Sequence, residues 1–482
     1  MVEFRKIASF RSIEDFRDYA DAVGAAIPVP DAAAAADPSP FKEPFHYTSG
    51  ITGRTTTLAN RWAILPMEGW DCLADGAPSG TARRRWLRFA ESGASLIFGC
   101  EAAAVMKEGK ANTRQMTITR ETFEAIGTLR EEMVKRHTSL YGDRPMVGLQ
   151  LTHSGRFSKP NDDTRLESRT AYRHPYLDEK FHCTEKNLLS DGEVEGIIEK
   201  FHEAARLAQE AGFDFVDIKC AHGYLGHEFL SAHTRPGKYG GTFENRTRFF
   251  REIVEGIKNG APGLDVAVRL SLGDMIPFQK GTGGTGEPAA RHTNENPYRF
   301  AFGGDGTGLG FDFTEPAAFV KMARDLGIRL ICATLGSPYY VPHIQRPAAY
   351  AVSDGYLPPE DPLLGAARQI HAVQTMKALC PETVFIASGM TYLQEFLPAV
   401  GGELLRTGGA DFIGIGRMTL SYPEICADSM AGKPLDRQKI CRTFGDCTNA
   451  PRAGLVSGCF PLDPFYRVHP DGERLKQIKK RP

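Results

Sequence analysis

The sequence of 482 residues lacks several features that mark specialised classes of protein. No apolar run approaches the roughly 20 residues that a membrane-spanning helix needs. The net charge is −1, so no global basic field favours nucleic acid or an anionic membrane. The opening segment MVEFRKIASFRSIEDF carries scattered charges and no apolar h-region, so we expect no export signal. These absences predict a cytoplasmic protein with a small-molecule substrate and no nucleic-acid or membrane partner; a homo-oligomer stays open.

The sequence also lacks the high cysteine density of a disulfide-stabilised protein. Ten cysteines are spread from Cys72 to Cys459, far below the density of a disulfide scaffold. This usage is typical of reduced thiols in a cytosolic enzyme. What is present is an ordinary globular mixture, 41% hydrophobic and 24% charged, in a chain long enough for a substantial core.

Short apolar runs of strand character recur along the chain, each followed by a segment of helical period. They are RWAIL (61–65), SLIFG (95–99), MVGLQ (146–150), FVDI (215–218), VAVRL (266–270), RLICAT (329–334), VFIAS (384–388) and FIGIG (412–416). Continuous apolar strands that alternate with amphipathic helices indicate a parallel sheet covered by helices. Eight such units favour a closed α/β TIM (β/α)₈ barrel; an open doubly wound sheet is the alternative, because periodicity does not prove closure.

The barrel repeat predicts the division of the chain. We expect an N-terminal extension over residues 1–50, a barrel over 51–435 and a C-terminal extension over 436–482 that packs on the barrel and ends in a solvated basic stretch. The N-terminal extension, with its tract PDAAAAADPSP, is expected to be a mobile leader or surface packing. The long glycine-rich connection over 272–313, after the fifth strand, is typical of a flexible lid or linker.

In a parallel barrel the active site lies at the carboxyl ends of the strands. Glycines after the seventh and eighth strands leave N–H groups free for a phosphate, and Arg417 adds charge-assisted hydrogen bonds. Gln150 and Arg269 suit a flat heterocycle with carbonyl and ring-nitrogen groups. Arg269 favours the negative charge that an oxidised flavin gains when it takes a hydride. The strand ends therefore predict a flavin site.

The motifs GLQLTHSGR, DFVDIKCAHGYLGHEFLS, YGGTFENRTRF, VRLSLGD, FIASG and ADFIGIGR stand in the order seen in the old yellow enzyme family of FMN-dependent oxidoreductases, which this chain resembles from about residue 50 to 430. The resemblance implies a TIM barrel, non-covalent FMN and reduction of the flavin by NADH or NADPH. The reduced flavin of that family typically passes hydride to an activated C=C bond. The resemblance does not choose between NADH and NADPH.

The resemblance also implies roles for residues of this chain. Tyr224 matches the tyrosine that donates a proton to the substrate carbon, and a phenol of pKa about 10 is protonated at pH 7. His222 and Lys219 stand where two residues bind the substrate carbonyl oxygen. Residues that match cofactor contacts are Leu65, Pro66, Met67 and Ala102 beside the flavin, Gln150 at its pyrimidine edge, Arg269 at N1–C2=O, and Ser388, Gly389, Gly416 and Arg417 at the phosphate.

Two positions depart from the family. Lys219 replaces a histidine, and an ammonium there has three interpretations: it stabilises a developing enolate, it selects an anionic substrate, or burial lowers its pKa and it acts as a base. Glu68 stands where the family often has threonine or cysteine. Because a carboxylate beside a flavin would lower its potential, we expect Glu68 to point away or to be protonated.

Other patterns in the sequence suggest different sites or activities. His222, His227 and His233 do not predict a metal site, because a five-residue spacing misaligns the first two on a helix and zinc needs three or four convergent ligands. Cys441, Cys447 and Cys459 roughly match the cluster cysteines of iron–sulfur relatives, but a phenylalanine takes the place of a fourth, so we expect a packed remnant. FMN-dependent oxidation of an amine or cleavage of a C–N bond is the alternative activity, and a flavin-free barrel is a third.

Overall fold

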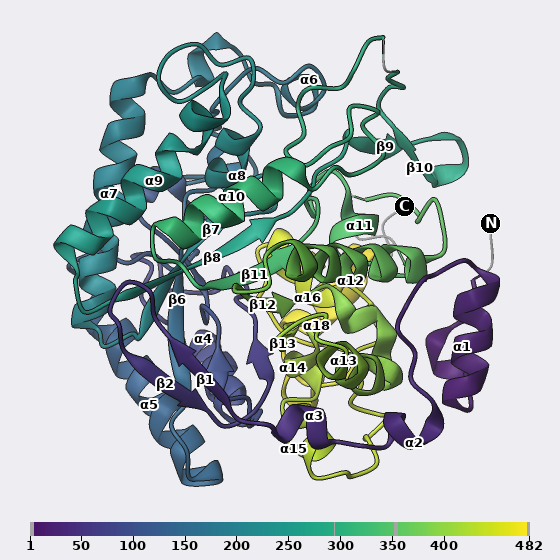
Figure 1. Cartoon of the computed structure of the whole chain (residues 1–482). Coiled ribbons are helices and arrows are strands. Elements are labelled where there is room, and N and C mark those ends of the chain that lie inside the picture. Colours follow the sequence, from purple (N-terminus) through teal and green to yellow (C-terminus); the bar gives the residue numbers. More distant parts are fainter. Residues whose placement is uncertain (1–3, 294, 351–354, 480–482) are drawn as a thin grey trace.

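A computed structural model describes residues 4–293, 295–350 and 355–479. Figure 1 shows strands in the centre of the molecule with helices around them. Among the helices described, none is both long enough and apolar enough to cross a membrane.

Eight parallel strands form a closed barrel. The order of neighbours is β4-β3-β13-β12-β11-β8-β7-β6, and β6 pairs with β4 to close the ring. The predicted TIM barrel is confirmed, and the open sheet is wrong, because an open sheet would leave β4 and β6 as edges. The strands are β3 (Trp62–Ile64), β4 (Leu96–Ile97), β6 (Met146–Thr152), β7 (Phe215–Cys220), β8 (Asp265–Ser271), β11 (Leu330–Thr334), β12 (Val384–Ala387) and β13 (Phe412–Ile415), with β5 (Ala102–Ala104) added beside β6.

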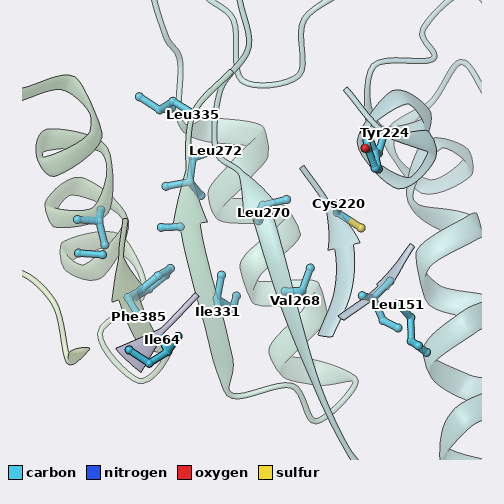
Figure 2. Packing of buried hydrophobic residues seen from close by; sticks show 14 of the residues in the cluster. Ile64, Leu151, Cys220, Tyr224, Val268, Leu270, Leu272, Ile331, Leu335 and Phe385 are labelled. Atoms are coloured by element: carbon cyan, nitrogen blue, oxygen red, sulfur yellow. The ribbon is translucent and has the colours of Figure 1, made fainter. Parts of the chain in front are cut away.

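Side chains alternate between two apolar layers because successive residues of a strand face opposite sides. One cluster fills the barrel interior and takes a residue from every barrel strand, among them Ala63, Phe215 and Phe412. Tyr47 and Leu58 from the hairpin β1 (Phe45–Thr48) and β2 (Thr55–Leu58) join it. The other cluster lies between strands and helices, and Figure 2 shows two neighbouring strands, β8 and β11, contributing Val268, Leu270 and Ile331 to it.

The helices cover the barrel. Those that connect barrel strands are α4 (Gly80–Ala90), α5 (Phe123–Tyr141), α6 (Leu177–Phe181), α7 (Asp191–Glu210), α8 (Leu225–Leu230), α9 (Phe243–Gly260), α10 (Thr314–Asp325), α11 (Pro342–Gln345), α12 (Pro362–Leu379) and α13 (Leu397–Arg406). Local sequence explains their limits, as α7 illustrates. The Ser190 hydroxyl accepts from the Glu193 N–H while the Glu193 carboxylate accepts from the Ser190 N–H. Gly212, with φ of +82°, turns the chain out of the helix.

The N-terminal extension packs on the barrel. It holds α1 (Ile13–Ala22), α2 (Ala32–Ala35) and α3 (Ser39–Lys42). Phe16 is fully buried and stacks on Phe396 at 4.4 Å between ring centroids, and Phe41 stacks on Trp62 at 4.2 Å. Of the two expectations for this segment, surface packing is correct for the described residues and a mobile leader is wrong.

The long connection after β8 is ordered by its own apolar side chains. It contains a two-stranded ribbon of β9 (Phe278–Lys280) and β10 (Gly286–Pro288). Met275, Ile276 and Phe302 are buried in the main core cluster. A free linker is therefore wrong for this segment, because aromatic and aliphatic side chains anchor it to the core, while the lid stays a prediction.

The C-terminal extension forms a small core of its own. Following α14 (Met418–Ser421) and α15 (Ile425–Met430), it holds α16 (Asp446–Arg452), α17 (Pro464–Arg467) and α18 (Asp471–Lys479). Its apolar cluster includes Leu455, Tyr466 and Leu475. Asp463 binds Arg84 of α4 through two hydrogen bonds of 2.8 and 3.0 Å. The basic side chains of α18 are exposed, as expected, but the helix itself is packed through Leu475.

Candidate active site

A cavity opens at the carboxyl ends of the barrel strands. Its wall includes Leu65, Pro66, Met67, Glu68, Trp70, Gln150, Lys219, His222, Tyr224, Arg269, Pro338, Tyr339, Gln345, Arg346, Gly389, Thr391, Gly414, Gly416, Arg417, Cys447, Thr448, Pro451 and Arg452. All predicted site residues except two belong to this wall. Residues that the sequence places at the ends of separate strands therefore line one cavity.

Ala102 and Ser388 are the two predicted contacts that the cavity wall lacks. Ala102 lies in β5, where it pairs with Gln150 and its carbonyl accepts from the Gln115 side chain at 2.9 Å. The Ser388 hydroxyl donates to the Ala333 carbonyl at 2.6 Å. Neighbouring strands thus use the polar groups of both residues, which strand position alone did not reveal.

One group of cavity-lining residues, which we call the cationic wall, consists of Gln150, Arg269 and Arg417. The Gln150 amide donates to the buried carboxyl of Asp217, which also accepts from the Arg269 backbone N–H at 2.6 Å. Burial raises the pKa of Asp217 to about 6, while Gln150 and Arg269 oppose the rise. Arg269 donates to the Pro66 carbonyl at 3.3 Å. Its buried Nε has no hydrogen-bond partner among the described residues.

The part of the cationic wall around Arg417 has free space and an available cation. Within the described ranges the Arg417 side chain has no ion pair and is half-buried. A Cβ added to Gly416 would meet no protein atom closer than 3.8 Å, so a side chain there would project into the cavity. Gly389, with φ of +80°, begins the 3₁₀ turn Met390–Phe396.

These residues fit FMN. The flavin ring needs hydrogen-bond donors along its polar edge. Gln150 and Arg269 supply such donors in the cavity wall, and the Arg269 Nε has no hydrogen-bond partner among the described residues. The phosphate needs a cation and close backbone approach, which Arg417 and Gly416 offer. The cationic wall is therefore suited to a planar, anionic cofactor.

A second group of cavity-lining residues, which we call the paired wall, consists of Glu68, Lys219, Tyr224 and Tyr339. Lys219 and Glu68 form an ion pair, with side chains only 4% and 15% exposed. Glu68 Oε2 accepts from the Tyr224 hydroxyl at 2.6 Å. Burial, then Glu68 and Tyr339, raise the pKa of Tyr224 well above its ordinary value. The expectation that Glu68 points away is wrong, because Lys219 draws the carboxylate into the wall.

Lys219 carries a charge that its partner neutralises. Burial lowers the pKa of Lys219, and the Glu68 carboxylate opposes that change. The ammonium also lies 3.5 Å from the centroid of the Tyr224 ring, in the geometry of a cation–π contact. Lys219 thus presents an ion pair to the cavity rather than an isolated cation.

His222 occupies a strained turn directly after β7. Its φ is +67°, unusual for a residue with a Cβ. Ser271 accepts from its N–H at 3.0 Å and Ser337 donates to its carbonyl at 2.7 Å, which holds the turn. Burial lowers the pKa of His222 well below its ordinary value, so the imidazole is neutral at pH 7. Its Nε2 lies 3.0 Å from the Gln345 amide nitrogen.

Sequence reasoning missed Tyr339 and Gln345. Both follow β11, the one strand end for which no site residue was predicted. Tyr339 stacks on Phe157 at 4.0 Å between centroids, and its hydroxyl lies 2.8 Å from that of Tyr224. The run SPYY, two residues after RLICAT, was the available signal, because it places tyrosines beyond the carboxyl end of a barrel strand.

The C-terminal extension also contributes to the cavity. Cys447, Thr448, Pro451 and Arg452 of α16 belong to the wall. The Arg452 guanidinium carbon lies 5.8 Å from the centroid of the Tyr339 ring. Burial raises the pKa of Cys459 to about 12, with smaller contributions from Cys441 and Cys447. In the described part of the chain, no group of three or more cysteine, histidine or acidic residues is placed to hold a metal ion.

Comparison with known proteins agrees with this geometry. Residues 50–294 match the model of the NADH:flavin oxidoreductase / NADH oxidase family. An NADPH dehydrogenase of Bacillus subtilis (strain 168) is 32% identical over 381 residues, covering 77% of this chain and 90% of that protein. An NADPH dehydrogenase of Geobacillus sp. (strain WCH70) is 32% identical over 234 residues, 48% of this chain, and the match covers 64% of its own length.

A solved structure supports the fold. The old yellow enzyme homologue from Zymomonas mobilis superimposes with a TM-score of 0.54 at 20% identity, covering 82% of this chain and 94% of that one. The expectations of an oxidoreductase and of FMN with NADH or NADPH are confirmed at the level of the family. The chain belongs to the NADH:flavin oxidoreductase / NADH oxidase family.

Proposed function

We propose that this protein uses NADH or NADPH to reduce an activated carbon–carbon double bond, with FMN as the bound cofactor. The observation that carries the proposal is that one cavity is lined both by the cationic wall and by Tyr224, Lys219 and His222. When bound, FMN supplies the hydride to the electron-poor alkene carbon. The cavity residues then have to bind, orient and protonate.

The cationic wall has the task of holding the flavin. Arg269 is proposed to bind the N1–C2=O edge, where its cation favours negative charge, and Gln150 the pyrimidine edge. Gly389, Gly416 and Arg417 are proposed to hold the phosphate. Leu65, Pro66 and Met67, which follow β3, supply apolar contact.

The paired wall has the task of polarising the substrate and moving a proton. A neutral His222, with Lys219 beside it, is proposed to hydrogen-bond the carbonyl that activates the alkene. Because Glu68 neutralises Lys219, an anionic substrate gains less there than at an isolated ammonium. Neutral enones are therefore the preferred substrate class, and Tyr224 is proposed to protonate the carbon beside the one that receives hydride.

A second candidate function rests on Glu68. Its carboxylate lines the cavity, where it would contact a cationic amine, and it accepts a hydrogen bond from the Tyr224 hydroxyl. This arrangement supports the alternative of FMN-dependent amine oxidation or C–N cleavage.

An anaerobic experiment in two steps tests both. The holoenzyme is mixed with NADH or NADPH while flavin absorbance is followed, and a neutral cyclic enone is added afterwards. We expect the nicotinamide to bleach the flavin and the enone to restore it. A flavin that an amine bleaches and nicotinamides do not would overturn the reductase and support the second candidate.

A further inference from the structure

Glu68 is a hydrogen-bond acceptor shared by three donors in the cavity wall. Lys219 Nζ pairs with one carboxylate oxygen. The other oxygen accepts from Tyr224 at 2.6 Å and from the Trp70 indole N–H at 3.1 Å. An ionised carboxylate can only accept, so all three hydrogens point toward Glu68. The contact with Lys219, together with the indole donor, fixes this carboxylate as the end point of a chain.

The same carboxylate determines the direction of the next hydrogen bond. A phenol has one hydrogen, and Tyr224 gives its hydrogen to Glu68. In the 2.8 Å contact between Tyr224 and Tyr339, the Tyr339 hydroxyl is therefore the donor. The hydrogens run from Tyr339 through Tyr224 to Glu68. Stacking of Tyr339 on Phe157 holds the outer member of the chain in place.

We propose that Glu68 is a positioning residue that directs the Tyr224 O–H toward its own carboxylate and sets Tyr339 as the residue that restores the proton. This rests on the proposed role of Tyr224 as proton donor. When Tyr224 turns to the substrate, its O–H bond breaks as the new C–H bond forms. Tyr339 then gives its proton to the Tyr224 oxygen and takes one from water, so no charge remains on either phenol.

Electrostatics around Tyr224 favour this division of roles. A tyrosinate beside the Glu68 carboxylate would bring two negative charges together in a buried site. The Lys219 ammonium over the Tyr224 ring offsets part of that repulsion. Farther out, Arg269 and Asp217 act on Lys219, and Arg452 lies over Tyr339. Glu68 is thus the group whose removal changes the acidity of Tyr224 most directly.

The first test compares Glu68→Gln with the wild-type holoenzyme. Glutamine keeps the size of the side chain and removes the charge, and it leaves the Lys219 cation without its anion. We expect the alkaline limb of enone reduction to move to lower pH by about one to three pH units. Tyrosinate absorbance, read as the difference between E68Q and the double variant E68Q/Y224F, should appear at correspondingly lower pH without any turnover.

Two control variants separate charge from structure. Glu68→Asp keeps the carboxylate and should restore the wild-type alkaline limb. Glu179→Gln makes the same change at an exposed position of α6 and should leave the limb unchanged. An E68Q profile identical to wild type in both pH rate and tyrosinate absorbance would overturn the proposal.

A second variant tests the chain if E68Q does not fold. Tyr339→Phe removes the donor to Tyr224 but keeps the ring stack on Phe157. We expect the first turnover of pre-reduced enzyme with enone at the wild-type rate and a steady-state rate lower by about tenfold or more. An unchanged steady-state rate would overturn the assignment of Tyr339. If wild type reduces no enone, the proposed function fails, and the tyrosinate titration alone still decides the role of Glu68.

Discussion

The two groups of residues that line the cavity differ in whether their charges are paired. The cationic wall keeps a half-buried Arg417 without an ion pair among the residues described and an Arg269 with an unused buried Nε. The paired wall joins Lys219 to Glu68 and ties Tyr224 to the same carboxylate. The cationic wall therefore keeps positive charge available for an anion. In the paired wall the charges of Lys219 and Glu68 cancel, and a chain of hydrogen bonds links Tyr339, Tyr224 and Glu68. In the proposed function, anion binding and proton transfer therefore fall to different groups of residues in one cavity.

Tyr224→Phe should break the paired wall with the largest effect. It removes the proposed proton donor and the hydrogen bond to Glu68, while the cationic wall stays intact. We expect the enone half-reaction to slow by about 10²- to 10⁴-fold and flavin reduction by nicotinamide to keep its rate. Stopped-flow measurement of the two half-reactions checks this. An equal loss in both would remove the proton-donor role.

Lys219→Met tests whether the paired wall is neutral as a unit. Methionine fills similar space but leaves the Glu68 carboxylate buried without its ion-pair partner. We expect the free energy of unfolding to fall by about 3–5 kcal/mol. The double variant K219M/E68Q should recover most of that loss, because no uncompensated charge remains. Urea unfolding of the four proteins measures the coupling, and additive losses would show that the two side chains act independently.

Asp217→Asn tests the anion beneath the cationic wall. The folded-state pKa is raised to about 6 from 3.8, so the folded protein holds this proton more tightly than the unfolded chain. The stability contributed by this group is fully present below pH 3.8 and is lost as pH rises through about 6. A rise of two pKa units corresponds to about 3 kcal/mol.

The measurement is thermal or urea unfolding of the flavin-free protein between pH 4 and pH 8, with D217N beside wild type. The variant should lack the decline that Asp217 contributes, so the difference between the two curves changes with pH. Parallel curves would mean that Asp217 does not titrate in this range.

The contrast between the walls also separates what the sequence could predict from what it could not. Gln150, Arg269, Gly416 and Arg417 follow directly from strand positions, because every strand of a closed parallel barrel ends on the same face. Their place in the cavity wall needed no knowledge of side-chain conformation. The strands themselves were predictable as continuous apolar runs, since both of their faces are buried.

The partners within the paired wall could not be predicted in the same way. Glu68 and Lys219 are 151 positions apart, and their ion pair depends on side-chain rotamers that no periodicity encodes. Arg452 reaches the cavity from α16, beyond the barrel repeat, because a small apolar core around Leu455 and Tyr466 holds the extension in place. These contacts depend on how irregular segments pack, which the local sequence pattern does not predict.

Arg417→Ala tests the cationic wall with the smallest expected effect. The side chain lies at the proposed phosphate end, where charge-assisted hydrogen bonds are worth about 1.5–3 kcal/mol, a loss of roughly 10- to 150-fold in affinity. FMN binding to the flavin-free protein should weaken by that factor. Riboflavin, which has the same ring and no phosphate, should bind wild type and variant equally. Flavin fluorescence titrations with both ligands measure the two affinities. If riboflavin weakened as much as FMN, Arg417 would be supporting the ring side of the cavity, and the division between a phosphate end and a ring end would have to be redrawn.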